Sequence, residues 1–142
     1  MINKEDLISQ LREKGLKVTS QRLAVIDALV KNRKLHPGAS LIYKEARKKT
    51  KSVSLSTVYA TLKEFSENGL IKSLEFDRME NRYDANLSEH INLICKRCGA
   101  IIDYDLPTTV EPRDIVKKSG FVVTEARMEY YGYCRDCLKR TA

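Results

Sequence analysis

The sequence predicts an α+β protein in two parts, with helices first and mainly strands second. Apolar residues recur at helical spacing as far as residue 69, whereas short strand-like runs dominate from residue 71 onward. All four cysteines lie in the second part, as two Cys-x-x-Cys pairs. A length of 142 residues is enough for one good core or two small ones. We therefore expect two domains, residues 1–83 and 84–142.

Four helices are expected in the first domain, and three of them follow a residue that caps helices well. Asn3 precedes the first helix, Thr19 or Ser20 the second, and Ser54 the fourth. Because proline and glycine interrupt helices, His36-Pro37-Gly38 separates the second helix from the third. The expected helices run from Asn3 to Gly15, from Thr19 or Ser20 through Val30, over roughly residues 39–48, and from Ser54 to about Asn68-Gly69.

The fourth helix has two contrasting faces. Small and hydroxyl side chains such as Ser56 lie on one face together with Lys63, and Tyr59 lies at its border. Such a face lets the backbone approach a partner closely and meets a negative charge, as a helix in a DNA major groove must. An ordinary amphipathic surface helix has the same pattern. The expected buried stripe on the opposite face consists of Leu55, Val58, Leu62 and Phe65.

A two-stranded hairpin is expected after the helices. Residues 71–76 form the first strand, residues 77–81 a polar turn, and Arg82-Tyr83 the return strand. The whole excess of the +7 net charge falls in residues 1–82. Helices followed by a hairpin in a basic block form the winged-helix pattern, in which the last helix reads the DNA groove and the hairpin touches the backbone. The alternative is a basic surface that is merely solvated.

The second domain reads as a small α/β module. Its expected strands cover residues 91–94, 100–104 and 121–131, and a helix at about residues 110–118 ends at Gly120. Residues 84–89 look like a hinge that leads into it. A module of this size needs a covalent or metal staple, or a partner, to be stable.

The two Cys-x-x-Cys pairs predict a structural zinc site, with one Zn²⁺ per subunit. Each pair places two sulfurs on one tight turn, and two such turns complete a tetrahedron with no open position. No apolar run could cross a bilayer, and the first six residues do not resemble a signal peptide. We therefore expect a cytoplasmic chain, in which thiols stay reduced. Two disulfides, four free thiols or a redox switch are the alternatives. The ligands would be Cys95, Cys98, Cys134 and Cys137.

A second metal site is a weaker expectation from the residues alone. Alternation along residues 90–95 puts His90 and Asn92 on one strand face and Cys95 on the other, so imidazole and thiols should serve separate sites. Nitrogen and carboxylate ligands would favour Mn²⁺ or Fe²⁺. Ordinary surface or core roles for these residues are equally compatible with the spacing. The candidate ligands from both domains are His36, Asp84, His90 and Asp103.

Several motifs together resemble the Fur family of metal-dependent repressors. They are Gly-Leu-Lys-Val-Thr-Ser-Gln-Arg at residues 15–22, His36-Pro37, Ser-Leu-Ser-Thr-Val-Tyr-Ala-Thr-Leu at residues 54–62, and the two cysteine turns. The resemblance covers almost the whole chain. It implies a homodimer with an N-terminal winged helix, a C-terminal α/β dimerisation domain, a structural four-cysteine zinc and a regulatory metal near the hinge.

Within that family the chain is most similar to the peroxide-sensing branch. Asp103 fits this branch, because iron-uptake regulators usually carry Glu there. Asn92 departs from the family, which usually has His, and its amide oxygen is a weaker, neutral ligand. The additional His-rich site of many relatives cannot form, since the chain has only two histidines. The implied ligands of the regulatory Fe²⁺ or Mn²⁺ are His36, Asp84, His90, Asn92 and Asp103.

The resemblance implies a repressor whose bound metal favours one hinge angle and so sets two recognition helices at groove spacing on a double-stranded DNA operator. In the peroxide-sensing version, peroxide reacting with bound Fe²⁺ oxidises His36 or His90. Tyr59, Ser56 and Thr57 are the candidates for groove contacts. The candidates for phosphate or base edges are Lys63, Lys17 and Arg22, of which the last two would otherwise be simply solvated.

Three other functions remain open. The first is a metal-uptake regulator that senses Fe²⁺, Mn²⁺ or Zn²⁺ without peroxide chemistry. The second is a metal-dependent hydrolase, which needs a general base, and strand alternation points the nearest one, Glu89, away from His90. The third is an interaction module built on the zinc turns, which leaves the basic half unexplained. We expect no enzyme activity, no organic cofactor and no membrane partner.

Overall fold

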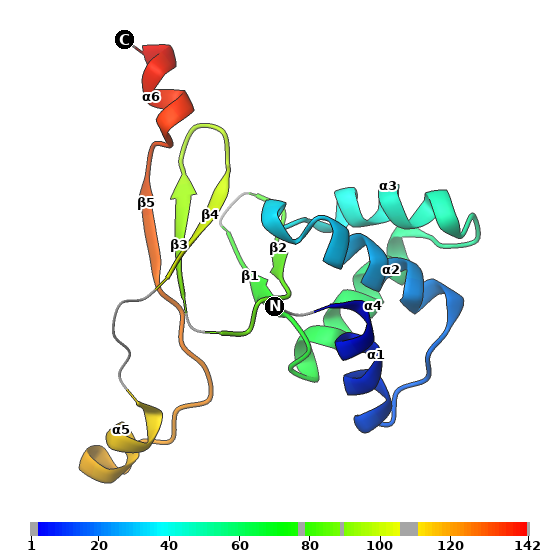
Figure 1. Ribbon diagram of the computed structural model, residues 1–142, viewed down its shortest axis with the longest axis horizontal. Helices are drawn as coiled ribbons and strands as arrows, with labels where there is room; N and C mark the ends of the chain where they lie inside the picture. The colour runs from blue at the N-terminus through cyan, green and yellow to red at the C-terminus, as the bar shows by residue number, and fades with distance from the viewer. Residues whose placement is uncertain (1–2, 77–78, 89, 106–110, 142) are drawn as a thin grey trace. The chain divides into compact units, whose positions relative to one another are not determined.

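The computed structural model describes residues 3–76, 79–88, 90–105 and 111–141 (Figure 1). The chain divides into two compact units, Met1–Leu87 and Ser88–Ala142. None of the helices in the described residues combines the length and apolar character that crossing a membrane requires. Helices fill the first unit and a small sheet the second, which confirms the α+β prediction.

The first unit holds four α-helices, and the predicted caps are in place. The side chain of Asn3 accepts a hydrogen bond from the Asp6 backbone amide. The Asp6 carboxylate in turn accepts one from the Asn3 backbone amide, which completes a capping box. Thr19, rather than Ser20, caps the second helix, and Ser54 caps the fourth. The helices are α1 (Lys4–Glu13), α2 (Ser20–Lys31), α3 (Ala39–Lys49) and α4 (Leu55–Glu67), with a 3-10 turn at Arg33–Leu35.

These helices pack around one apolar core. The prediction for α4 is wrong at one position, because Leu55 is 41% exposed and the buried stripe includes Thr61 instead. Leu55 is the first residue of the helix, with exposed neighbours on both sides. Thr61 can be buried because its hydroxyl donates to the Thr57 carbonyl of its own helix (2.8 Å). The most buried core side chains include Leu7, Leu11, Ile26, Leu29, Ile42, Val58, Leu62 and Phe65.

The predicted hairpin follows α4 and completes the winged-helix arrangement. Strands β1 (Lys72–Leu74) and β2 (Arg82–Asp84) pair antiparallel, with Ser73 opposite Tyr83. The first strand is shorter than the expected residues 71–76, and part of the expected turn lies outside the described residues.

Strand β2 also holds the segment that leads from α2 into α3. The Tyr83 amide donates to the Pro37 carbonyl (3.0 Å), and the Arg82 side chain donates to the carbonyls of Leu35 and His36. His36 adopts a left-handed conformation, with φ of 48°. Such a backbone is costly for a residue other than glycine, so these bonds from β2 are what keep His36 in place.

The second unit is a three-stranded sheet in the order β4-β3-β5, with helices in its connection and at its end (Figure 1). Strand β3 pairs antiparallel with β4 and parallel with β5. Its elements are β3 (His90–Cys95), β4 (Ile101–Asp105), α5 (Pro112–Ser119), β5 (Glu129–Gly132) and α6 (Arg135–Thr141).

The sequence prediction fails in two parts of this unit. The expected strand over residues 121–131 is limited to Glu129–Gly132, where the pairing with β3 lies. Phe121 and Val122 are 65% and 72% exposed, and none of the strands in the described residues pairs with them. The last helix, α6, was not predicted. Helix α5 does end at Gly120 as expected, in a left-handed conformation with φ of 72°.

The start of α3 is capped by a residue from the hairpin. Gly38 precedes α3 and has no side chain to serve as a cap. The Glu80 carboxylate takes this role, since it accepts bonds from the Ser40 amide (3.3 Å) and the Ser40 hydroxyl. A Cβ at position 38 would overlap this carboxylate. A side chain at position 38 would therefore push the Glu80 carboxylate away from Ser40.

We expect Gly38→Ala to destabilise the protein by about 1 kcal/mol, the usual effect of losing a helix cap, because the new methyl group displaces the Glu80 carboxylate. Urea unfolding of the full chain, followed by circular dichroism, measures this change. In a Glu80→Ala background the same substitution should have little further effect. Equal and additive effects of the two substitutions would contradict the proposed cap.

Candidate metal sites and recognition helix

The four cysteines form one cluster in the second unit. Cys95 ends β3, Cys98 lies on the turn that follows, and Cys134 and Cys137 lie at the β5–α6 junction. Their ligand sulfurs all lie within 4.8 Å of one another, and none is in a disulfide. The Sγ atoms of Cys98 and Cys134 are 3.7 Å apart. A tetrahedron with Zn–S bonds of about 2.3 Å has an edge of about 3.8 Å, so this arrangement fits a structural zinc.

Sheet pairing brings the two cysteine turns together. Parallel pairing of β3 with β5 places Cys95 opposite Gly132, and the Cys134 amide donates to the Cys95 sulfur (3.4 Å). Hydrogen bonds from the backbone of Cys98 and then Cys134 lower the pKa of Cys95 to about 6. Burial raises the pKa of Cys137 to about 12. Because zinc binds thiolates, the metal must displace the proton of Cys137 when it binds.

The first unit contains one histidine–carboxylate pair. His36 follows the 3-10 turn, and Asp84 is the last residue of β2. The His36 Nε2 lies 3.5 Å from an Asp84 carboxylate oxygen, and both side chains are buried. The other Asp84 oxygen accepts the Asn86 amide (2.8 Å). The contacts between β2 and the 35–38 segment thus place two potential metal ligands side by side.

The second unit contains a matching pair on one face of its sheet. The His90 Nδ1 lies 2.7 Å from the Ser88 carbonyl and therefore carries the hydrogen, which leaves Nε2 toward Asp103 (3.3 Å). Asn92 lies directly across from Asp103, and its buried Oδ1 accepts no hydrogen bond from the described residues. An unsatisfied buried oxygen costs free energy, which a metal ion would offset. Within each unit, nitrogen and oxygen atoms that can bind a metal lie close together, a combination that favours Mn²⁺ or Fe²⁺.

The exposed face of α4 carries three of the six DNA candidates. Tyr59 is 46% exposed, and Ser56 and Lys63 are exposed beside it. The Lys63 Nζ lies 4.0 Å from a carboxylate oxygen of Glu67, one turn further along the helix. Lys17, a fourth candidate, is exposed in the segment between α1 and α2. These four side chains are accessible to a polyanion.

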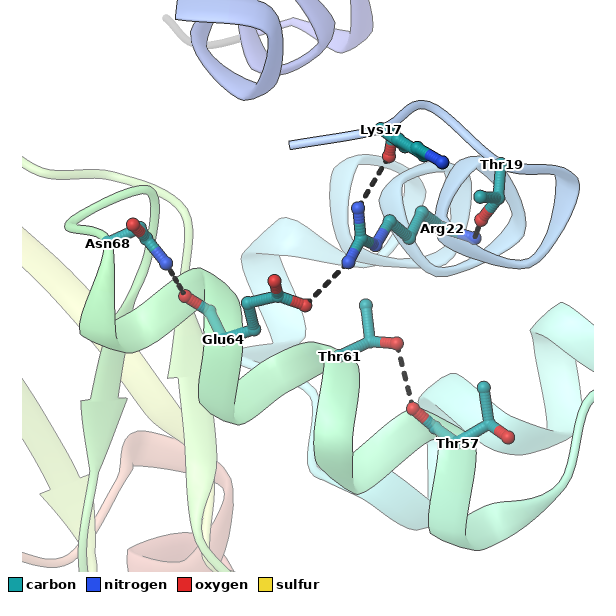
Figure 2. A network of polar contacts seen from close by, with 7 residues as sticks. All are labelled: Lys17, Thr19, Arg22, Thr57, Thr61, Glu64 and Asn68. Carbon is teal, nitrogen blue, oxygen red and sulfur yellow. Dashed lines mark hydrogen bonds and ion pairs between the residues drawn. The ribbon is translucent and has the colours of Figure 1, made fainter. Parts of the chain in front are cut away.

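The other two candidates make contacts within the first unit. The Thr57 hydroxyl lies 2.9 Å from the Ser54 hydroxyl. The Arg22 guanidinium donates to the Lys17 carbonyl (2.6 Å) and to the Glu64 carboxylate (2.7 Å), as Figure 2 shows. Sequence reasoning missed Glu64, and no local pattern could have revealed it, because its partner is 42 residues away.

Comparison with known proteins gives consistent results. The model of the ferric uptake regulator family matches residues 13–131. The peroxide operon regulator of Bacillus subtilis (strain 168) is 36% identical over 137 residues, which cover 96% of this chain and 94% of that protein. The solved Helicobacter pylori ferric uptake regulator Fur, with three functional metal binding sites, has a TM-score of 0.74 at 28% identity and covers 96% and 95% of the two chains. PerR from Streptococcus pyogenes has a TM-score of 0.53 at 29% identity, covering 96% and 94%.

We expect Cys98→Ser to remove the zinc, because three thiolates no longer close the tetrahedron. Native mass spectrometry of the full chain should show about one zinc per wild-type subunit and little in the variant. Asn92→Leu serves as the matched control in the same unit and should retain zinc. Full zinc content in Cys98→Ser would contradict the assignment of this ligand.

Proposed function

The chain belongs to the ferric uptake regulator family, and from this premise we propose that it is a transcriptional repressor that binds an operator in double-stranded DNA and responds to peroxide through a divalent metal. The observation that carries the proposal is the presence in each unit of one histidine–carboxylate pair, next to a winged helix in the first unit and a four-cysteine cluster in the second.

The DNA-binding part of the proposal rests on α4 and the charge distribution. Residues 1–83 contain the winged helix, and the net positive charge of the chain lies in this part. We assign groove contacts to Tyr59, Ser56 and Thr57, and phosphate contacts to Lys63 and Lys17. Phosphate contacts make affinity fall steeply with salt, since binding releases counterions. Operator binding also implies that the protein works in the cytoplasm.

We assign the regulatory metal to His36 and Asp84 from the first unit and His90, Asn92 and Asp103 from the second. A metal held by ligands from both units would favour one angle between them, and so one spacing of the recognition helices in a dimer. Loss of the metal would release that constraint and lower operator affinity. Arg82 of β2 donates a hydrogen bond to the His36 carbonyl, and the His90 ring donates one to the Ser88 carbonyl, so both histidines are oriented.

The dimerisation part rests on the second unit. One face of its sheet carries Ile102, Leu93 and Tyr130 in a cross-strand row, next to Tyr104. Ile102, Tyr104 and Tyr130 are 50%, 57% and 61% exposed. A row of exposed apolar side chains on a sheet favours burial against a second copy, and residues 84–142 would thus form the dimerisation domain.

Peroxide sensing is the finer part of the proposal. The ligands fit Fe²⁺ as well as Mn²⁺, and bound Fe²⁺ would supply the electrons that activate peroxide. The residue oxidised would be His36 or His90: one peroxide oxygen would enter a ring C–H bond and the other would leave as water. The altered imidazole would be a poorer ligand, and loss of the metal would lower operator affinity. Similarity to proteins named as peroxide regulators supports this version over simple metal sensing.

A second function, a metal-uptake regulator without peroxide chemistry, is favoured by one observation. Asn92 supplies a neutral amide oxygen where the family usually supplies imidazole, which weakens the metal site. With two histidines in the whole chain, no further His-rich site is available. A hydrolase receives no support, and Glu89, the base it would need, lies outside the described residues.

The full, zinc-loaded protein should bind an operator, selected from a genomic fragment pool, only when Fe²⁺ or Mn²⁺ is present. A brief anaerobic peroxide pulse should abolish the Fe²⁺ complex and spare the Mn²⁺ complex in a gel-shift experiment. Mass spectrometry should then find added oxygen on His36 or His90. If both complexes survive peroxide while still requiring metal, the protein is a metal-uptake regulator instead.

Asn92→Leu should weaken Mn²⁺ binding by roughly tenfold or more, because it removes the buried amide oxygen at nearly constant volume. Titration of free Mn²⁺, followed by electron paramagnetic resonance, measures the affinity. Asn92→His should bind Mn²⁺ at least as tightly as the wild type. Unchanged affinity in Asn92→Leu would show that Asn92 is not a ligand.

A further inference from the structure

The segment between α1 and α2 lies against the recognition helix, with a hollow of about 530 Å³ between them. Thr57, Ala60, Thr61 and Glu64 of α4 line one side. The other side is lined by Gly15, Leu16, Lys17, Thr19, Gln21 and Arg22. The segment begins at Gly15, which has a left-handed φ of 74°, and ends at the Thr19 cap of α2. Exposed Lys17 lies between these two points and lines the same hollow as these residues of α4.

Arg22 joins the three parts that surround the hollow. From the first turn of α2, one arm of its guanidinium donates to the Lys17 carbonyl (2.6 Å) and the other to the Glu64 carboxylate (2.7 Å), as Figure 2 shows. The side chains of Arg22 and Glu64 are only 21% and 35% exposed. A planar guanidinium can hold two acceptors at a fixed separation, which the flexible ammonium of lysine cannot do.

We infer that Arg22 and Glu64 are positioning residues for DNA recognition, which hold Lys17 in register with the groove-reading face of α4. This inference rests on the proposed operator binding. It replaces the expectation from the sequence that Arg22 contacts DNA, since Arg22 then acts through Lys17. Glu64 fixes the guanidinium, and the guanidinium fixes the Lys17 backbone. The distance between Lys17 and Tyr59 is thereby set before DNA arrives, which lowers the entropy lost on binding.

The charge of Glu64 makes this inference testable. If Glu64 acts only through its charge, or if it positions Arg22, removal of the charge should change operator affinity in opposite directions. A carboxylate near DNA repels phosphates, so its neutralisation should strengthen binding if charge alone matters. If Glu64 holds Arg22 in place, its neutralisation should weaken binding to the operator. Glu67, one turn further along the same helix and 64% exposed, offers a matched control for the charge.

The experiment compares the metal-loaded full chain carrying Glu64→Gln, Glu64→Asp or Glu67→Gln with the wild type. Fluorescence anisotropy measures affinity for an operator from the genomic pool and for a scrambled duplex. Glu64→Gln and Glu64→Asp should both weaken operator binding by roughly tenfold, because each weakens the contact with Arg22 and only one removes the charge. Binding to the scrambled duplex should fall less, because only the operator complex needs Lys17 in register with the groove contacts of α4. Glu67→Gln should bind the operator at least as tightly as the wild type.

A cycle with Arg22→Gln separates positioning from direct contact. If Arg22 acts through its contact with Glu64, Glu64→Gln should have little further effect on operator affinity in the Arg22→Gln background. Equal operator affinities for Glu64→Gln and Glu67→Gln, or an equal loss on both duplexes, would overturn the inference and leave the proposed function standing. Failure of the wild-type protein to bind any operator would instead overturn the proposed function, and this inference with it.

Discussion

The second unit depends on the four-cysteine cluster, because little else in it is buried. Its described buried apolar residues are few, and α5 buries none of its side chains. A sheet of three short strands is hard to stabilise on apolar burial alone. The cluster joins the turn after β3 to the β5–α6 junction, and so it links the carboxyl-terminal ends of the parallel strands β3 and β5. The cluster therefore also supports the sheet face that carries His90, Asn92 and Asp103.

The first unit has a full apolar core, and what it needs in addition is contacts that hold a few polar groups in unusual positions. His36 has a left-handed backbone, Arg22 bridges two elements, and α3 lacks a cap of its own. In each case a side chain distant in sequence supplies the missing contact: Arg82 for His36, Glu64 for Arg22 and Glu80 for α3. The residues that we assign to metal and DNA are thus supported by polar contacts outside the core.

The sequence predicted those features that local chemistry determines. Asn3, Thr19 and Ser54 cap their helices as their side chains predict, and the spacing of the cysteines predicts the cluster. It failed where distant contacts decide. The apolar pattern of residues 121–128 predicted a strand, but in the described part of the chain the paired residues of β5 begin only at Glu129. The contacts of Glu64 and Glu80 could not be predicted from the sequence, because a single glutamate forms no recognisable motif and its partner lies about forty residues away.

The cap of α3 has a consequence for the order in which the first unit folds. Glu80 reaches Ser40 across 40 residues of sequence, so the first turn of α3 is not capped until the hairpin has formed and docked. Contacts of such separation form late, because a long loop must close first. The part of the chain just after His36 is therefore among the last to become ordered. During synthesis, His36, which we propose as a metal ligand, would acquire its final geometry only after Arg82 and the rest of the hairpin have left the ribosome.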